Sequence, residues 1–373
     1  MLEKLILTAV MLVILSSCNV LPQESSPASP TKIEVEETTP QPVKETKPTE
    51  SVKPLVDARK LLIIKSEAEK YLRSINFNGA VLVVNNDSIL LEEGFGMADI
   101  KLEKANTSTT QFRIASLTKQ FTAAAILQLE EAGSLSTNDK LLAYFPDYKK
   151  WGDITIHQLL SQTSGIARET QDVVKTPVDD ILRLNAQRPL TASGGFQYSN
   201  INYILLGRII EQVSKLTYEE YMNRNIFGAI SMANSGVAST TNKMMDYASG
   251  EGKSKTDFAS AVNYEGAGSI YSTVLDLYHW NEALNNHLVI SQESTDKMFT
   301  SYSNSSYGYG WYLNKKVAYH LGNINGYGAI ITRSLSDHSV IIVLSNNELR
   351  RAQTVPISNK LARLMENSEM VIT

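Results

Sequence analysis

The 373-residue chain has a single cysteine, Cys18, so no intrachain disulfide can stabilise it. Its five histidines show no spacing typical of metal ligands. The net charge is only −4 and no segment is strongly basic, which argues against a nucleic-acid partner. What remains is an ordinary globular composition, 43% hydrophobic and 20% charged, with enough apolar material for a sizeable core.

The N-terminus carries a short apolar run at residues 5–15. A helix that crosses a bilayer takes about 20 residues, so this run fits the apolar core of a signal peptide instead. Cys18 directly follows the small residue Ser17, an arrangement that resembles a bacterial lipobox. We therefore expect residues 1–18 to be a lipoprotein signal peptide, and Cys18 to anchor the protein to a bacterial membrane outside the cytoplasm. An ordinary cleaved signal peptide with an incidental cysteine is the alternative.

Residues 19–56 hold seven of the 11 prolines, mixed with Glu, Thr, Ser and Lys. Such a segment buries too little apolar surface to offset its chain entropy, so we expect an extended tether that lifts a domain off the membrane. A disordered tail without function is the alternative. The folded domain should span residues 57–367, followed by a tail at 368–373.

Strand-like segments lie towards both ends of this domain, and helical periodicity fills its middle. The expected strands are 79–84, 88–93, 309–313, 317–321, 328–334 and 339–345. The expected helices include 57–74, 116–132, 203–215 and 355–366. This order predicts an α+β fold, with one antiparallel sheet built from the two ends of the domain and covered by helices.

The first chemical motif, Ser116-Leu-Thr-Lys119, opens a long apolar helix. Residues three apart share a helix face, so the Lys119 amine should reach the Ser116 hydroxyl and activate it as a nucleophile. The positive end of the helix dipole favours negative charge on the serine oxygen. Ser-x-x-Lys also begins at Ser29, in the tether, and at Ser294, in a polar segment. The alternative for Ser116 is a helix-capping serine beside a surface lysine.

Two further motifs follow. Tyr198 and Asn200 lie just before a predicted helix, so both side chains can face one site. A tyrosine flanked by cations can transfer protons, and an asparagine can both donate to and accept from a substrate amide. His320 ends a predicted strand, and Gly322 would let a substrate lie close to the strand edge. The alternatives are a turn asparagine beside a packed tyrosine, and a surface histidine.

In this order, the three motifs resemble those of the serine β-lactamase and penicillin-binding protein superfamily. The tyrosine form of the second motif is similar to the branch of class C β-lactamases, D-alanyl-D-alanine carboxypeptidases and family VIII esterases. Segments at 157–166, 266–273 and 343–346 match the same branch. The resemblance covers about residues 75–370. It implies a β-lactamase/transpeptidase-like fold, with a five-stranded antiparallel sheet flanked by helices and an α-rich lobe.

The resemblance also implies roles for the motif residues. Ser116 would be the acylated nucleophile, Lys119 its base partner and Tyr198 a proton relay. Asn200 would hold the substrate amide. The backbone N–H groups of Ser116 and Asn323 would form an oxyanion hole. No metal or cofactor is implied.

The third motif departs from the usual Lys-Thr-Gly. We assign it to His320 and Gly322, because a Lys-x-Gly at 150–152 precedes Tyr198 and breaks the motif order. A mostly neutral histidine and Leu321 offer neither the charge nor the hydroxyl that would bind a substrate carboxylate. This departure favours an esterase or a carboxypeptidase over an efficient β-lactamase.

We therefore predict a serine hydrolase that forms an acyl-enzyme on Ser116. Its substrate would be a D-amino-acid peptide, a peptidoglycan-type amide, a β-lactam or a small ester. The alternative is a catalytically quiet lipoprotein that binds cell-wall fragments or β-lactams in the same site. The residues assign neither the membrane, inner or outer, nor the oligomeric state.

Overall fold

The computed structural model describes residues 58–170, 176–191, 194–238, 248–249, 264–324, 326–347 and 351–372. The expected signal peptide with Cys18 and the expected tether lie outside these residues. Within the described ranges, no helix combines the length and the apolar character that crossing a membrane requires.

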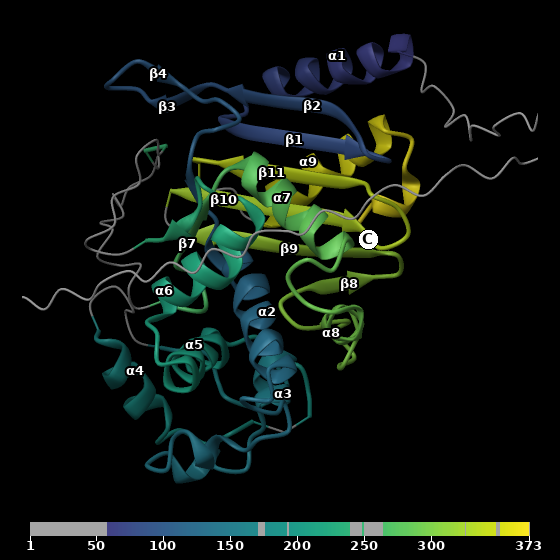
Figure 1. Cartoon of the computed structure of the whole chain (residues 1–373). Coiled ribbons are helices and arrows are strands. Elements are labelled where there is room, and N and C mark those ends of the chain that lie inside the picture. Colours follow the sequence, from purple (N-terminus) through teal and green to yellow (C-terminus); the bar gives the residue numbers. More distant parts are fainter. Residues whose placement is uncertain are drawn as a thin grey trace, which may run out of the picture. The chain divides into compact units, whose positions relative to one another are not determined.

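An antiparallel sheet of six strands, in the order β2-β1-β11-β10-β9-β8, forms the centre of the domain (Figure 1). Its strands are β1 (Gly79–Asn85), β2 (Ser88–Phe95), β8 (Tyr312–Asn314), β9 (Val317–Ile324), β10 (Tyr327–Ser334) and β11 (Val340–Ser345). β1 pairs with β11, so the two ends of the domain build one sheet, as predicted. The resemblance implied five strands; the sixth, β8, is the strand expected at 309–313, and it is a three-residue edge strand beside β9.

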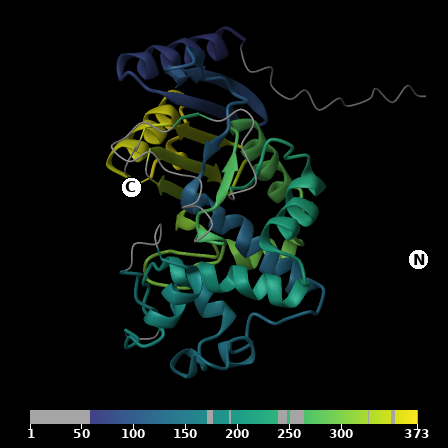
Figure 2. The same cartoon turned by 90° about the vertical axis from the view of Figure 1, so that its left-hand side faces the viewer.

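The sheet is buried on both faces. Along β11, Ile341 and Val343 contact the cluster formed with α1 (Ala58–Ser74) and α9 (Arg351–Leu364), whereas Ile342 and Leu344 belong to the cluster on the opposite face. α7 (Val274–Asn285) packs on that second face, so Figure 2 shows the sheet between α9 and α7. Strands covered on both sides read as continuous apolar runs, which is why the period-two pattern is absent here.

The C-terminus packs against the first of these faces. Residues Ser368–Met370 form a short 3₁₀ helix, and the side chains of Met370 and Ile372 are buried beside α9. The Asn359 amide donates to the Ile372 carbonyl and accepts from its N–H, both at 2.8 Å. The packed domain therefore extends to residue 372, and the tail that we expected from 368 is part of the fold.

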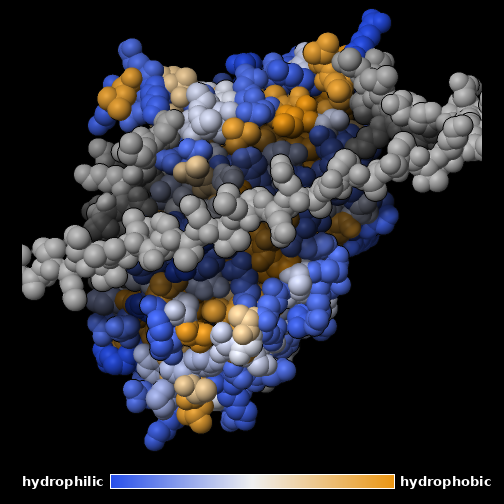
Figure 3. All heavy atoms as spheres, in the orientation of Figure 1, coloured by the Kyte–Doolittle hydropathy of each residue, from blue (hydrophilic) through white to orange (hydrophobic). Residues whose placement is uncertain are grey.

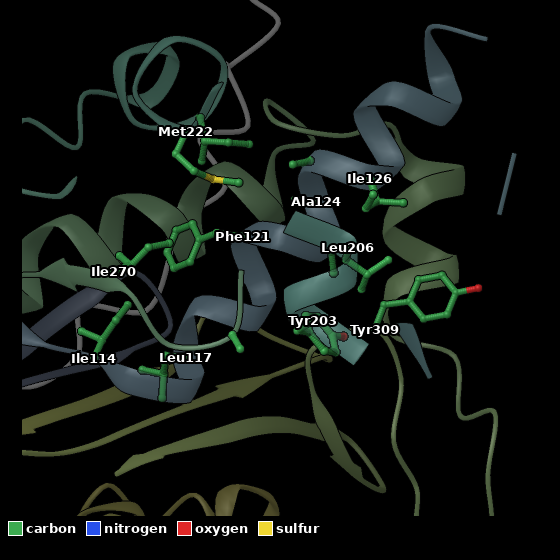
Figure 4. Packing of buried hydrophobic residues seen from close by; sticks show 14 of the residues in the cluster. Ile114, Leu117, Phe121, Ala124, Ile126, Tyr203, Leu206, Met222, Ile270 and Tyr309 are labelled. Carbon is green, nitrogen blue, oxygen red and sulfur yellow. The ribbon is translucent and has the colours of Figure 1, made fainter. Parts of the chain in front are cut away.

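The α-rich lobe lies below the sheet in Figure 1. It contains α2 (Thr118–Glu131), α3 (Ile156–Leu160), α4 (Val178–Asn185), α5 (Asn200–Ser214), α6 (Tyr218–Tyr221) and α8 (Gln292–Met298). α2 is buried on almost every side and packs against α5. In Figure 4, Tyr203 and Leu206 of α5 lie on one side of α2, whereas Phe121 of α2 points to the other side, towards Met222. A helix covered all round is held by the surrounding core, and it can carry a side chain into a solvent-excluded site.

Two small sheets lie outside the central sheet. β3 (Met97–Asp99) pairs with β4 (Lys104–Ala105), and β7 (Ile270–Ser272) lies between β5 (Phe112–Arg113) and β6 (Gly236–Val237). β5 leads directly into the segment that bears Ser116.

The surface of the lobe is mostly hydrophilic (Figure 3). Apolar atoms gather near the upper edge of that view, where α1 lies. Leu62 and Ile63 of α1 are among the large apolar side chains exposed to solvent.

Candidate active site

Ser116 lies in a single 3₁₀ turn, Ala115–Leu117, between β5 and α2. The residue before it, Ala115, has a φ of +47°, a left-handed conformation that a side chain makes unfavourable. Such strain persists only where the surroundings enforce it, and it often marks functional sites. Ala115 and Leu117 are buried, whereas Ser116 remains partly exposed, so the turn presents the serine hydroxyl to solvent.

Lys119 follows in the first turn of α2 and is completely buried. Its Nζ lies 3.2 Å from the Ser116 Oγ, 2.9 Å from the Asn200 Oδ1 and 2.8 Å from the carbonyl oxygen of Ala267. The expected approach of the amine to the serine hydroxyl is thus present in the structure.

These partners define what the Lys119 amine can do. Burial lowers the pKa of Lys119 to about 7, with the Glu169 carboxylate raising it and the Arg168 guanidinium lowering it further. A neutral amine has two N–H groups and one lone pair. The Asn200 Oδ1 and the Ala267 carbonyl can only accept, so they take the two N–H groups. The lone pair is left for the Ser116 hydroxyl, which is the geometry of a general base.

Tyr198 completes the polar group around the serine. Its ring centroid lies 4.9 Å from the Lys119 Nζ, a cation–π distance that stabilises the amine when it is protonated. Burial raises the pKa of Tyr198 well above its usual range, and a hydrogen bond with Ser116 opposes this rise. The phenol therefore keeps its proton at neutral pH, so it can donate to the serine oxygen or to a leaving group.

Glu169 is a site residue that the sequence analysis missed. Its Oε1 accepts a 2.6 Å hydrogen bond from the Asn200 Nδ2, across 31 positions of sequence. Because Lys119 occupies the Asn200 Oδ1, the two contacts fix the orientation of the Asn200 amide. Glu169 lies in a segment without regular structure after α3, and no motif marks it. Only the folded chain brings it to this place.

His320 is buried rather than on the surface, and it is neutral. Burial, together with the positive charge of Lys119, lowers its pKa to about 3, although the hydrogen bond to Leu321 opposes this effect. Its Nδ1 lies 2.8 Å from the Leu321 carbonyl oxygen, which can only accept, so Nδ1 carries the proton. The Nε2 then accepts from the Tyr307 hydroxyl at 3.2 Å. Both ring nitrogens are thus bonded within the protein, whereas we expected His320 to bind substrate directly.

The structure gives a different physical reason for a glycine at position 322 from the one we expected. A methyl group at this position would lie 2.1 Å from the Ile114 carbonyl oxygen. The absence of a side chain therefore lets β9 approach the backbone that precedes Ser116, rather than making room for substrate. Asn323 follows it, is exposed, and lies opposite Gly328 in the β9–β10 ladder.

Three other side chains of the types found in serine triads make their hydrogen bonds elsewhere. The His157 Nδ1 lies 2.7 Å from the Tyr309 hydroxyl, and Asp153 is exposed and paired with Lys140. Asp276 is buried and accepts hydrogen bonds from the backbone of Asn234 and from the Ser235 hydroxyl. These groups stabilise local structure and form no triad with the serine.

One set of described residues has the donor atoms for a metal ion. Asp87, Glu282 and His338, far apart in the sequence, bring their ligand atoms within 4.8 Å of one another. Asp87 and His338 are about half exposed and already pair at 2.7 Å. Spacing along the chain could not reveal this set. Exposed acidic groups often gather in this way without an ion, so the set carries no assignment.

Comparison with known proteins agrees with this geometry. The family model described as Beta-lactamase matches residues 67–361. The penicillin-binding protein PbpX of Bacillus subtilis (strain 168) is 33% identical over 301 residues, which cover 79% of this chain and 77% of that protein.

Solved structures show the same fold. A penicillin binding protein from Bacillus halodurans is 25% identical, with a TM-score of 0.68 over 82% of this chain and 100% of that one. The D-amino acid amidase of Ochrobactrum anthropi SV3, in complex with D-phenylalanine, is 19% identical, with a TM-score of 0.71 over 83% of this chain and 99% of that one. With the family match over most of its length, the chain belongs to the beta-lactamase family.

Proposed function

We propose that this protein is a serine hydrolase that works through an acyl-enzyme on Ser116. Neutral Lys119 takes the proton from the Ser116 hydroxyl as the oxygen attacks the substrate carbonyl. The proton on Lys119 then returns, through the Tyr198 hydroxyl, to the leaving group, and water hydrolyses the resulting ester on Ser116. The observation that carries this proposal is the buried Lys119 amine, 3.2 Å from the serine oxygen, with a pKa of about 7.

The remaining residues position the substrate in this proposal. The Asn200 Nδ2 has a second N–H that can donate to a substrate amide, since only one is used by Glu169. The N–H groups of Ser116 and Asn323 form the oxyanion hole. His320 supports the site through Tyr307, because its own nitrogens are occupied.

The substrate that fits best is a D-amino-acid amide, a peptidoglycan-type peptide or a small ester. Neutral His320 and the apolar Leu321 supply no cation for a substrate carboxylate, which disfavours efficient β-lactam hydrolysis. Penicillin-binding protein relatives and the D-amino acid amidase fold support amide or ester chemistry. We also propose that a lipid on Cys18 anchors the enzyme to a bacterial membrane outside the cytoplasm.

The test is a pre-steady-state assay of the domain from residue 56 onwards with a nitrophenyl ester. Rapid acylation and slower deacylation give a burst close to one equivalent of nitrophenol per enzyme. Ser116→Ala should abolish the burst, whereas Ser294→Ala, in the other Ser-x-x-Lys of the domain, should retain it.

Each result has a clear meaning. A burst that Ser116→Ala removes establishes the nucleophile. Equal bursts in wild type and Ser116→Ala would mean that another serine reacts. A folded protein with neither burst nor turnover would favour the alternative, a binding lipoprotein that uses the same site.

A further inference from the structure

Only one of the two oxygens of the Glu169 carboxylate accepts a hydrogen bond from the described residues. Its Oε1 accepts from Asn200, whereas its Oε2 is shielded from solvent and has no hydrogen-bond partner among the described residues. An unpaired carboxylate oxygen that is removed from water is costly, so such groups are few in native structures and call for a specific explanation. Glu169 is linked through Asn200 and Lys119 to Ser116. An oxygen that lacks a hydrogen-bond donor therefore lies in the same polar cluster as the nucleophile.

Lys119 does not meet this demand. All three of its polar contacts go to Ser116, Asn200 and Ala267, and the amine is neutral when it acts as a base. Glu169 acts on Lys119 only through its charge. Among the described residues, no cation is bonded to the Glu169 Oε2.

Once Lys119 has lost its proton, as its role as a base requires, the neighbouring groups leave the negative charge of Glu169 dominant. His320 and Tyr198 are neutral at pH 7, for the reasons given above. Arg168, the other charged group that acts on Lys119, is exposed, so solvent and salt screen it more strongly than the shielded carboxylate. The field beside Ser116 therefore favours a substrate that carries a positive charge over one that carries a carboxylate.

We propose that Glu169 forms a subsite for the ammonium group of the substrate, so that the preferred substrates are amides or esters with a free amino group next to the reacting carbonyl. An ammonium supplies the missing N–H donor to Oε2 and pairs with the charge. This inference rests on the proposed function and names its substrate class.

The experiment measures inhibition constants against hydrolysis of the nitrophenyl ester. The two competitors are D-phenylalaninamide and 3-phenylpropanamide, which lacks only the amino group. The assay runs at about pH 7, where an α-amino group with a pKa of about 7.7–8.0 is mostly protonated. A charge-assisted hydrogen bond predicts that wild type binds the amine about 10- to 100-fold more tightly.

Glu169→Gln should reduce this preference to less than about threefold, because the amide is isosteric but uncharged. Effects of the substitution on the orientation of Asn200 act on both competitors and cancel in their ratio. A lower Lys119 pKa leaves less positive charge near the ammonium group, so it would raise the preference and cannot mimic the expected loss. Glu169→Asp, which restores the charge, should regain part of the preference. Glu67→Gln, an exposed position on α1, is the matched control and should keep the wild-type ratio.

Ester hydrolysis distinguishes a failure of the proposed subsite from a failure of the proposed hydrolase function. If the ester is hydrolysed but both competitors bind equally, or if Glu169→Gln keeps the preference, the subsite is wrong while the hydrolase stands. If wild type shows no ester hydrolysis and no burst, the proposed function fails, and the subsite falls with it.

Discussion

At the scale of single residues, the protonation state of Lys119 decides when the site can react. Its pKa of about 7 lies far below the usual value for lysine, because burial disfavours the ammonium. Below this pH the amine is protonated and has no lone pair for Ser116. The burst rate should therefore rise with pH through about 7 and then level off, which stopped-flow measurements across a pH series can check.

Substitutions at two positions sharpen this prediction. Lys119→Arg places a permanent cation at this position, which cannot accept the serine proton. Acylation should slow by about 10²- to 10⁴-fold, which is the usual rate contribution of a general base. Glu169→Gln removes the carboxylate that raises the Lys119 pKa, so the midpoint of its profile should move to lower pH. A midpoint that stays in place would contradict the electrostatic coupling between these two residues.

The sequence predicts the residues that a short motif holds together, and it misses those that only the fold assembles. Ser116 and Lys119 share one helical turn, so their contact follows from spacing. Glu169 and Tyr307 reach the site from segments without a motif, and no local pattern distinguishes them from loop residues. The charge and tautomer of His320 likewise depend on burial, which spacing does not reveal.

At the scale of elements, the approach of β9 to the Ser116 turn depends on Gly322. Gly322→Ala would place a methyl carbon 2.1 Å from the Ile114 carbonyl, so the strand or the turn must shift. We expect a destabilisation of about 1–3 kcal/mol and a large loss of burst amplitude. Denaturant unfolding and the ester assay measure the two effects.

Gly133→Ala is the matched control. Gly133 also has a positive φ, +67°, but a methyl group there meets no atom within 4 Å. Its stability should fall by about 1 kcal/mol from backbone strain alone, with the burst intact. Equal loss of activity in both variants would mean that the approach of β9 has no special role.

The C-terminal turn offers a second test at this scale. Met370 is fully buried in the turn that packs against α9 and β10, so Met370→Ala should lower the free energy of unfolding by about 2–5 kcal/mol. Leu62→Ala, at a side chain 67% exposed, should change it by no more than about 0.5 kcal/mol. A Met370→Ala protein as stable as wild type would show that this turn is dispensable.

The sequence predicts the helices and strands that have a clear apolar pattern, and it misses the ends of elements that only packing determines. The strands near both ends and the helix before the site follow from apolar patterning. The strand expected at 309–313 overlaps β8 but begins three residues too early, because so short an edge strand has no period that fixes its ends. The packed C-terminus was missed, because a polar sequence such as Asn-Ser-Glu resembles a tail.

At the scale of the whole molecule, the lipid anchor remains a proposal, since Cys18 lies outside the described residues. Cys18→Ala expressed in a bacterial host should release the protein from the membrane fraction, because buried acyl methylenes contribute about 0.8 kcal/mol each. The burst of the released protein should equal that of wild type. Retention of the variant in membranes would argue for another means of attachment.

The pairing of strands from both ends of the domain in one sheet also determines when the protein can fold during synthesis. The Ser345 hydroxyl donates to the carbonyl of Asn78, 267 positions earlier, and β1 pairs with β11 along its length. During synthesis, the hairpin of β1 and β2 therefore has an unpaired edge until β11 emerges from the ribosome, when nearly the whole domain has been made. Folding dominated by such distant pairings is slow. Until the last strands pair, the apolar strands of this hairpin stay exposed, so the growing chain is most prone to aggregation at this stage.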